Sequence, residues 1–216
     1  MLETFKQSYE TDIEKVVVGG KPFRFFVPKT LESFIDPQDI LNDFPLWAKL
    51  WQASLVMADH LTAMAVSPRK RMLEIGAGLG LVGIVAAAAG HRITMTESNP
   101  HALAFVQANT ELNGRDDLII QKLDWQRPGL MGSFDVIIGS EVMYKERDFG
   151  TLDRLFRTLL APGGEILLAA EMRPTTMAFF RQMQAGWSIE ARRMVMRAGG
   201  DETRIVLAKM SHGKQP

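Results

Sequence analysis

The chain has 216 residues and a mass of 24.1 kDa, and its 46% hydrophobic content is enough to build the core of one main domain. Its 25 basic residues balance 25 acidic ones, so no net positive field favours nucleic acid as a partner. The absence of cysteine excludes disulfides and cysteine nucleophiles, and the four histidines are not paired at the spacing of metal ligands, so no metal site is predicted.

The first segments of the chain predict an accessory arm. Two β-rich runs within residues 12–28 flank Gly19 and Gly20, a spacing typical of a hairpin. The N-terminus lacks the charged-then-apolar pattern of a signal peptide, and the longest apolar run, residues 81–89, is too short to span a bilayer. We therefore expect a cytoplasmic protein with no membrane partner.

A helical pattern follows the arm. Pro45 opens an amphipathic stretch over residues 46–64, in which Trp47 and Trp51 stand one helical turn apart. For Trp51, core packing and a lid over a ligand site are both open. We expect the arm and this cap helix to form residues 1–66, packed on a main domain of residues 67–216.

The main domain is organised around residues 71–90. A short apolar run leads into closely spaced glycines and then into an alanine- and valine-rich segment, the pattern of a buried strand, a tight turn and a helix. Residues 78–83 fit the dinucleotide pattern G-x-G-x-x-G, whereas residues 74–80 fit the acid-x-G-x-G-x-G arrangement of S-adenosylmethionine (SAM) methyltransferases. Glycines that serve packing alone are a third interpretation. The helix N-terminus beyond the turn favours a nucleotide ligand.

Carboxylates follow the next two predicted strands. Residues 92–96 form a strand that ends in Glu97, where an α/β nucleotide fold places the acid that accepts hydrogen bonds from ribose hydroxyls. The third strand ends in Asp124 and Trp125, a pair that suits the amine and the ring face of adenine. A capping aspartate and a packed tryptophan explain the same pair equally well.

The second half of the chain predicts a fourth buried strand and the end of the sheet. Residues 134–139 form that strand and deliver Ser140, Glu141 and Tyr144 to the edge where open α/β sheets bind ligands. The other expected elements are helices over 100–113, 148–160 and 175–185, strands over 118–123 and 165–170, and a terminal antiparallel hairpin of 187–196 and 203–209 around Gly199 and Gly200.

Two cofactor classes compete for the glycine turn. A short-chain nicotinamide enzyme would use a Tyr-x-x-x-Lys pair, but Asp148 stands four residues after Tyr144, and no second substrate domain follows. Glu74 before the first glycine, Asp124 after the third strand and the terminal hairpin favour SAM instead.

At this point the sequence resembles a family, the seven-β-strand SAM-dependent methyltransferases, and within it the family 16 protein lysine methyltransferases. The segments that carry the resemblance are residues 45–61, 73–84, 96–114, 123–125 and 140–144. The resemblance implies a Rossmann-like sheet of strand order 3-2-1-4-5-7-6 with strand 7 antiparallel. It also implies SAM as cofactor and S-adenosylhomocysteine as product.

The site residues expected from motif and resemblance fall into two groups. Glu141 and Tyr144 match the family's acid-x-x-aromatic motif after strand 4, which lines the transfer site, and they are the predicted catalytic residues. The predicted cofactor-binding residues are Trp51, Glu74, Gly76, Gly78, Gly80, Glu97, Ser98, Asp124, Trp125 and Ser140.

The acceptor substrate is expected to be a lysine side chain of a protein. Such an amine must lose a proton and align behind the methyl group, and Glu141 would hold it while Tyr144 offers an aromatic face. Whether Glu141 is a base or only an orienting group stays open. A small-molecule N- or O-methyltransferase of the same fold is the alternative, and a SAM-binding protein without catalysis is a third reading. The absence of an Asn/Asp-Pro-Pro-aromatic motif after strand 4 counts against nucleic acid as the acceptor.

Overall fold

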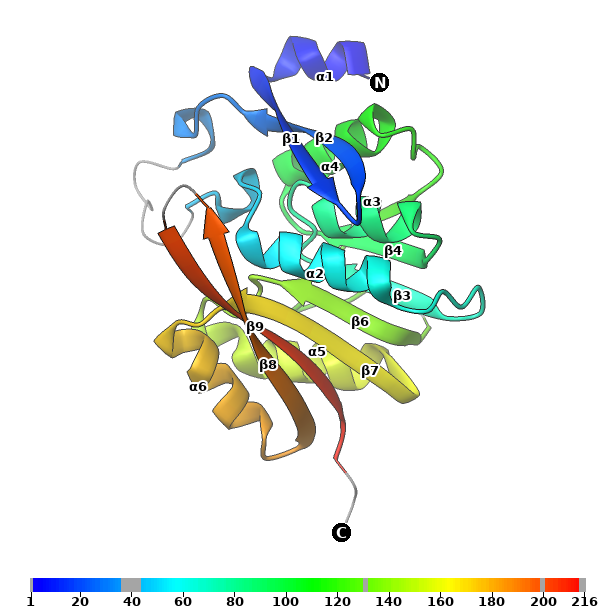
Figure 1. Ribbon diagram of the computed structural model, residues 1–216, viewed down its shortest axis with the longest axis vertical. Coiled ribbons are helices and arrows are strands. Elements are labelled where there is room, and N and C mark those ends of the chain that lie inside the picture. The colour runs from blue at the N-terminus through cyan, green and yellow to red at the C-terminus, as the bar shows by residue number, and fades with distance from the viewer. Residues whose placement is uncertain (1, 36–43, 130–131, 199–200, 214–216) are drawn as a thin grey trace.

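A seven-stranded mixed sheet organises the fold (Figure 1). The computed structural model describes residues 2–35, 44–129, 132–198 and 201–213. The sheet is built from β3 (Arg71–Ile75), β4 (Arg92–Glu97), β5 (Ile119–Lys122), β6 (Phe134–Ser140), β7 (Leu160–Glu171), β8 (Trp187–Ala198) and β9 (Asp201–His212).

The strands lie in the order β5-β4-β3-β6-β7-β9-β8. β9 pairs antiparallel with both of its neighbours, and the pairs from β5 to β7 are parallel. This is the order implied by the resemblance, with the seventh strand antiparallel, so the predicted fold class is confirmed. The chain winds outward from β3 in one direction and then crosses to β6 on its other side. The carboxyl ends of β3 and β6 therefore meet at a topological switch point, where ligands bind in open α/β sheets.

Helices cover both faces of the sheet (Figure 1). Helix α5 (Phe149–Leu159) shows why: its buried side chains recur at intervals of three and four residues, which leaves one apolar stripe facing the strands. Helix α3 (Leu81–Ala88) is buried almost all round, and α2 (Gln52–Ala63) packs against it and also contacts β7 and β9. None of the described helices is long and apolar enough to cross a membrane. One face carries α2 (Gln52–Ala63), α3 (Leu81–Ala88) and α4 (Pro100–Leu112), and the other carries α5 (Phe149–Leu159) and α6 (Pro174–Met183).

The predicted hairpin arm is present as β1 (Thr11–Val18) and β2 (Lys21–Pro28), preceded by a short helix, α1 (Leu2–Ser8), that was not predicted. Two asparagines, one in α4 and one at its C-terminal cap, attach this arm to the main domain. Asn109 accepts a hydrogen bond from the N–H of Phe26 and donates to its carbonyl, at 2.7 and 3.2 Å. Asn113 does the same for Arg24, at 3.1 and 2.7 Å.

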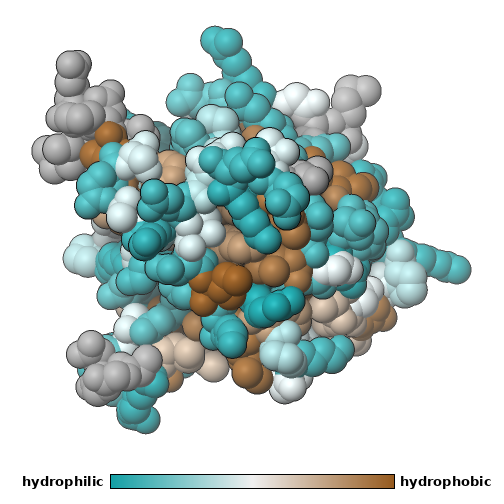
Figure 2. Space-filling view, turned by 90° about the horizontal axis from the view of Figure 1, so that it is seen from above, coloured by the Kyte–Doolittle hydropathy of each residue, from teal (hydrophilic) through white to brown (hydrophobic). Residues whose placement is uncertain are grey.

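Seen from above, the molecule is mostly hydrophilic, with hydrophobic side chains gathered near the middle of the face (Figure 2).

The prediction of one helix over residues 46–64 is wrong. A 3-10 turn, η2 (Leu46–Ala48), is followed by extended backbone at Lys49, and α2 begins only after Trp51. Tertiary packing accompanies the break. The Trp47 ring centre lies 5.1 Å from that of Phe34 and 5.3 Å from that of Phe105, whereas the Trp51 indole N–H donates to the carbonyl of Leu46, and both tryptophans line one pocket.

The other element predictions agree with the structure apart from small shifts at their ends. The strand predicted to begin at Glu165 begins at Leu160, because the Gly163 turn is an irregular part of β7, with a register shift in its pairing to β6. The predicted turn at Gly199 and Gly200 lies outside the described residues. The division into residues 1–66 and 67–216 stays a prediction.

Candidate functional site

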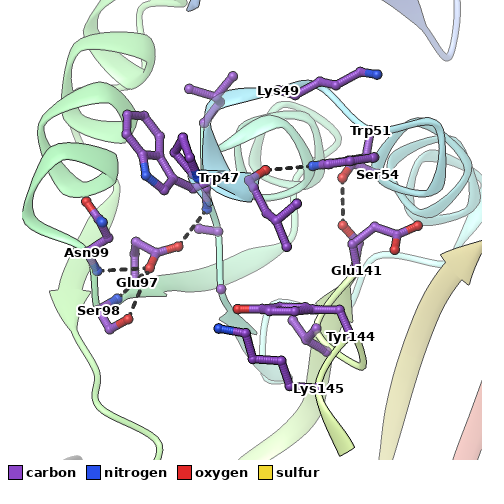
Figure 3. Close-up of a pocket in the computed structure, with 18 of the residues that line it drawn as sticks. Trp47, Lys49, Trp51, Ser54, Glu97, Ser98, Asn99, Glu141, Tyr144 and Lys145 are labelled. Carbon is purple, nitrogen blue, oxygen red and sulfur yellow. Dashed lines mark hydrogen bonds between the residues drawn. The ribbon is translucent and has the colours of Figure 1, made fainter. Parts of the chain in front are cut away.

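A pocket of about 310 Å³ opens at the carboxyl ends of β3, β4 and β6 (Figure 3). It is lined by the glycine turn, the segments after β4, β5 and β6, the start of α2 and the segment after β7. Two of the predicted site residues, Glu74 and Gly80, are not part of this lining. The pocket brings together the others: Trp51, Gly76, Gly78, Glu97, Ser98, Asp124, Trp125, Ser140, Glu141 and Tyr144.

The glycine turn exposes its backbone to the pocket. Gly76 and Gly78 have φ values of 63° and 55°, in the left-handed region that favours glycine. A Cβ on Gly76 would lie 3.1 Å from a methyl group of Val142, and one on Gly78 would lie 3.2 Å from the carbonyl of Trp47. A side chain at either position would be strained and would crowd the space above the turn, so these two glycines keep the backbone accessible to a ligand.

Gly80 has a different role from the predicted contact with a cofactor. It is the N-cap of α3, with φ of 88°, and a Cβ there would lie 2.5 Å from Val106 and 3.0 Å from Met95. Both neighbours belong to the hydrophobic core. The structure therefore accounts for this glycine by packing beneath the turn, the interpretation that the motif left open.

Glu74 also lies beneath the turn rather than in the pocket. Its side chain is buried, with 3% of the residue exposed, and among the described residues its Oε2 atom has no hydrogen-bond partner. Burial raises the pKa of Glu74 to about 8, and the nearby negative charge of Glu97 adds to the rise. A protonated Glu74 at neutral pH explains how this carboxyl tolerates its buried site. Nothing in its position supports the predicted cofactor contact.

Glu97 is held at the pocket wall by backbone N–H groups. One carboxylate oxygen accepts from Gly78 at 3.0 Å, and the other accepts from Ser98 at 2.6 Å and Asn99 at 3.0 Å. Asn99 in turn caps α4, so the acid is fixed between the glycine turn and a helix start. Its orientation is set by the local backbone. A ribose contact stays a prediction.

The remaining predicted cofactor residues line the pocket in less constrained ways. Asp124 lines the pocket and accepts from the N–H of Gln126, two residues further on, at 2.9 Å. This is a contact within a turn and not a helix cap, because no described helix begins there. The Trp125 ring lies against the glycine turn, 3.5 Å from the position of a Cβ on Gly76. The Ser140 hydroxyl shares a 2.6 Å hydrogen bond with the hydroxyl of Ser54 in α2.

Trp51 lines the pocket rather than filling the core. Its indole N–H donates to the carbonyl of Leu46 at 2.7 Å, which fixes the ring across the break between η2 and α2. The Lys49 ammonium lies 5.0 Å and the Arg173 guanidinium 5.7 Å from the ring centre. Figure 3 shows this ring beside Ser54 and Glu141. The position of Trp51 on the pocket wall is compatible with the lid interpretation, and a contact between Trp51 and a ligand stays a prediction.

Glu141 has an unusual backbone conformation and two partners for its carboxylate. It has φ of 54°, the only positive value outside glycine among the described residues, and such strain is typical of functional positions. One carboxylate oxygen accepts from the N–H of Glu171 at 2.8 Å, and the other contacts the Arg173 guanidinium at 3.2 Å. Burial raises the pKa of the Glu141 carboxyl, and the Glu171 N–H and the Arg173 charge offset part of the rise.

Tyr144 lies three residues after Glu141. It lines the pocket with 37% of its surface exposed, and the Lys145 ammonium lies 5.4 Å from its ring centre. Figure 3 shows Tyr144 and Glu141 both rising from the segment after β6. The acid-x-x-aromatic pair thus lines the same pocket as the glycine turn.

Among the pocket residues that sequence reasoning did not assign to the site are Trp47, Lys49 and Arg173. Trp47 and Lys49 were placed in a continuous helix, and Trp47 was noted only as the partner of Trp51. Arg173 follows β7, the strand next to β6, and charged residues just after neighbouring parallel strands meet at one edge of a sheet. That rule, applied to β7, would have found it.

Comparison with known proteins identifies the chain. A profile of the family described as lysine methyltransferase matches residues 38–186. The chain belongs to this family. The resemblance stated from the sequence is confirmed, and with it the choice of the SAM-dependent methyltransferase class over the nicotinamide enzymes.

Named relatives of this family match part of the chain. EEF1A lysine methyltransferase 3 of Mus musculus is 34% identical over 143 residues, which are 63% of this chain and 61% of the relative. Protein N-lysine methyltransferase METTL21A of Danio rerio is 35% identical over 134 residues, 58% of this chain and 61% of the relative. Histone-arginine methyltransferase METTL23 of Rattus norvegicus is 32% identical over 150 residues, 63% of this chain and 65% of the relative. The chain thus spans less than two thirds of the length of these relatives.

Solved methyltransferases share the fold at low sequence identity. Precorrin-6y C5,15-methyltransferase of Geobacter metallireducens superposes with a TM-score of 0.57 at 16% identity, covering 84% of this chain and 94% of that one. Ribosomal protein L11 methylase of Lactobacillus delbrueckii subsp. bulgaricus gives 0.56 at 22% identity, covering 74% and 77%. These likenesses concern the fold alone.

Proposed function

We propose that this protein is a SAM-dependent methyltransferase that transfers a methyl group to a lysine side chain of a protein. Family membership supports the proposal. One observation carries it further: a single pocket joins the glycine turn and Glu97 to Glu141 and Tyr144. A cofactor site and an acceptor site within one pocket are what a direct transfer between two bound molecules requires.

The residues on one side of the pocket fit SAM. Gly76 and Gly78 leave backbone accessible where a Cβ would intrude, and the Glu97 carboxylate is already fixed where hydroxyl donors would meet it. Glu97 would hold the ribose, while Asp124 and Trp125 would hold the adenine. A glycopeptide N-methyltransferase with the same fold was solved with SAM bound. When bound, SAM supplies a methyl group on a sulfonium centre.

The residues on the other side fit an amine acceptor. The negative charge of Glu141 would draw an ammonium group into the pocket and orient the amine through a hydrogen bond. Tyr144 would offer a ring face to the cation and a hydroxyl to the neutral amine. The chain would therefore act mainly by positioning the acceptor nitrogen, the largest task in an in-line displacement.

Arginine is the second candidate acceptor, because one relative is named as a histone-arginine methyltransferase. A guanidinium group would also be drawn to Glu141. The small-molecule acceptor considered from the sequence stays a third outcome of the test. The cytoplasmic location likewise stays a prediction.

The proposal is tested by incubating the purified protein with methyl-labelled SAM and a cell extract from the same source. We expect label in a protein band and, after hydrolysis, in methyllysine, with the label greatly reduced when Glu141→Gln replaces the unmodified protein. Label in methylarginine would support the second candidate. Label only in the small-molecule fraction, or no label in any fraction, would contradict a protein acceptor.

A further inference from the structure

Arg173 occupies an unusual position at the edge of the pocket. It stands between β7 and α6, immediately before the proline that opens the helix. One guanidinium nitrogen contacts Glu141 at 3.2 Å, and the other contacts Glu171 at 2.5 Å. The side chain is 38% exposed, whereas that of Glu141 is 12% exposed. The arginine thus reaches from the surface to a nearly buried carboxylate.

The two partners of Glu141 hold different oxygens. The N–H of Glu171 binds Oε1 at 2.8 Å, and Arg173 binds Oε2. Two donors on two oxygens fix the carboxylate plane, yet each oxygen keeps a second lone pair for an incoming N–H. These two contacts, from the segment that ends β7 and follows it, set the direction of the carboxylate.

The charges around Glu141 make Arg173 hard to replace. Glu171 carries a second carboxylate, and the guanidinium is the cation that separates the two acids. The other charged residues that line the pocket are Lys49, Lys145, Asp148, Glu97 and Asp124. Without Arg173, a nearly buried acid would face a like charge, and both effects favour its protonated form.

We propose that Arg173 is a positioning residue for methyl transfer: its guanidinium holds the Glu141 carboxylate in the direction and the charged form in which the acceptor amine meets it. The inference rests on the proposed function. The same guanidinium lies 5.7 Å from the Trp51 ring centre, so one side chain links both walls of the acceptor side.

The first experiment measures acceptor methylation by Arg173→Ala and Arg173→Lys, with Arg181→Ala in α6 as an exposed control. Calorimetry is expected to give unchanged SAM affinity for all three. For Arg173→Ala, kcat/KM for the acceptor should fall roughly tenfold to hundredfold at neutral pH. The acid limb of its pH profile should move up by about one unit or more. Millimolar guanidinium ion should restore part of the loss, because it can bind between the two carboxylates.

Arg173→Lys keeps the charge but not the two-point contact, so we expect an intermediate loss with a smaller movement of the acid limb. This variant also preserves the test if Arg173→Ala does not fold, as judged by circular dichroism. An unchanged kcat/KM together with an unchanged pH profile in the folded variants would overturn the proposal.

A second experiment separates this proposal from the proposed function. Carboxyl carbon NMR, with the Glu141 signal assigned by its loss in Glu141→Gln, follows the titration of Glu141 without any acceptor. Arg173→Ala should move this titration to higher pH, and Arg181→Ala should not. If the titration moves but no methyl acceptor is found, Arg173 holds Glu141 as inferred and the proposed function fails. If the titration stays in place while methylation occurs, the inference about Arg173 fails and the proposed function is unaffected.

Discussion

The two sides of the pocket are held together by different interactions. On the proposed cofactor side, the Glu97 carboxylate accepts hydrogen bonds from the backbone N–H groups of Gly78, Ser98 and Asn99. On the proposed acceptor side, Glu141 is bound by the backbone N–H of Glu171 and by the Arg173 side chain, which stand 30 and 32 positions away in sequence. The first side is thus fixed by backbone groups close to it in sequence, and the second by groups that follow a neighbouring strand, one of them a side chain.

This difference predicts how each side responds to change. Backbone donors come with the turn itself, so substitutions there disturb the fold and the binding site together. Side-chain pairs can be altered while the strands stay in place, so substitutions near Glu141 should change catalysis more than folding. The following predictions test that division, from the largest expected effect to the smallest.

Glu141→Gln should have the largest effect and should act on catalysis alone. Glutamine keeps an acceptor for the Glu171 N–H but removes the charge that meets the amine. We expect turnover to fall by about a hundred- to thousandfold, roughly 3–4 kcal/mol of barrier. SAM affinity by calorimetry should change little. If SAM binding were lost to the same extent as turnover, Glu141 would belong to the cofactor side, and the two sides of the pocket would not differ as described.

Gly80→Val should act on folding. Its Cβ would lie 2.5 Å from Val106, and the backbone has φ of 88°. We expect a loss of about 3 kcal/mol in the free energy of unfolding, from overpacking and left-handed strain combined. Gly114→Ala is the matched control, since it has φ of 64° with nothing within 4 Å. Urea unfolding should show only about 1 kcal/mol of loss there. If both variants lost the same free energy of unfolding, the contact of the new side chain with Val106 would not be destabilising.

Glu97→Ala should weaken SAM binding by about 1.5–3 kcal/mol, the range for charge-assisted hydrogen bonds. The change also frees the N–H of Gly78, so part of the loss comes from a loosened turn. Calorimetry on the folded variant measures the effect. Unchanged affinity would remove Glu97 from the cofactor site.

Glu74 should make stability depend on pH. Its pKa of about 8 in the folded protein lies above its ordinary value of 4.5. The folded state therefore holds a proton that the unfolded state releases, and stability is lost as pH rises from about 5 to 8. The free energy of unfolding should fall by at most about 1.4 kcal/mol per pH unit in this window. Glu74→Gln should flatten the dependence in urea titrations. A variant that keeps the full slope would show that another group is responsible.

The sheet could be predicted from the sequence because its strands are short apolar runs bounded by turn residues. Glu97 could be placed because a β-strand fixes where its last residue points, and the next helix start fixes the backbone around it. The motif alone could not separate Gly78, which faces the pocket, from Gly80, which faces Val106. Only the packing of α4 against the turn distinguishes them.

The proposed acceptor side was predicted only in part, because its residues come from segments that are far apart in the sequence. Glu141 and Tyr144 follow a strand directly, so their edge of the sheet was known. Arg173 reaches Glu141 only because β7 lies next to β6, which no local pattern states. The break before Trp51 escaped detection because helical periodicity continues through it, and tertiary packing overrides the local preference.

The side chain of Asn109 is hydrogen-bonded both to the N-terminal hairpin arm and to the glycine turn. Its side-chain amide pairs with the backbone N–H and carbonyl of Phe26, as a neighbouring strand would. The same NH₂ group also donates to the carbonyl of Leu79, at 2.9 Å. Opening of the arm and loosening of the turn therefore break bonds to the same buried amide. The backbone proton of Phe26 should exchange with solvent more slowly whenever a ligand steadies the turn, which makes a residue outside the pocket a reporter of its occupancy.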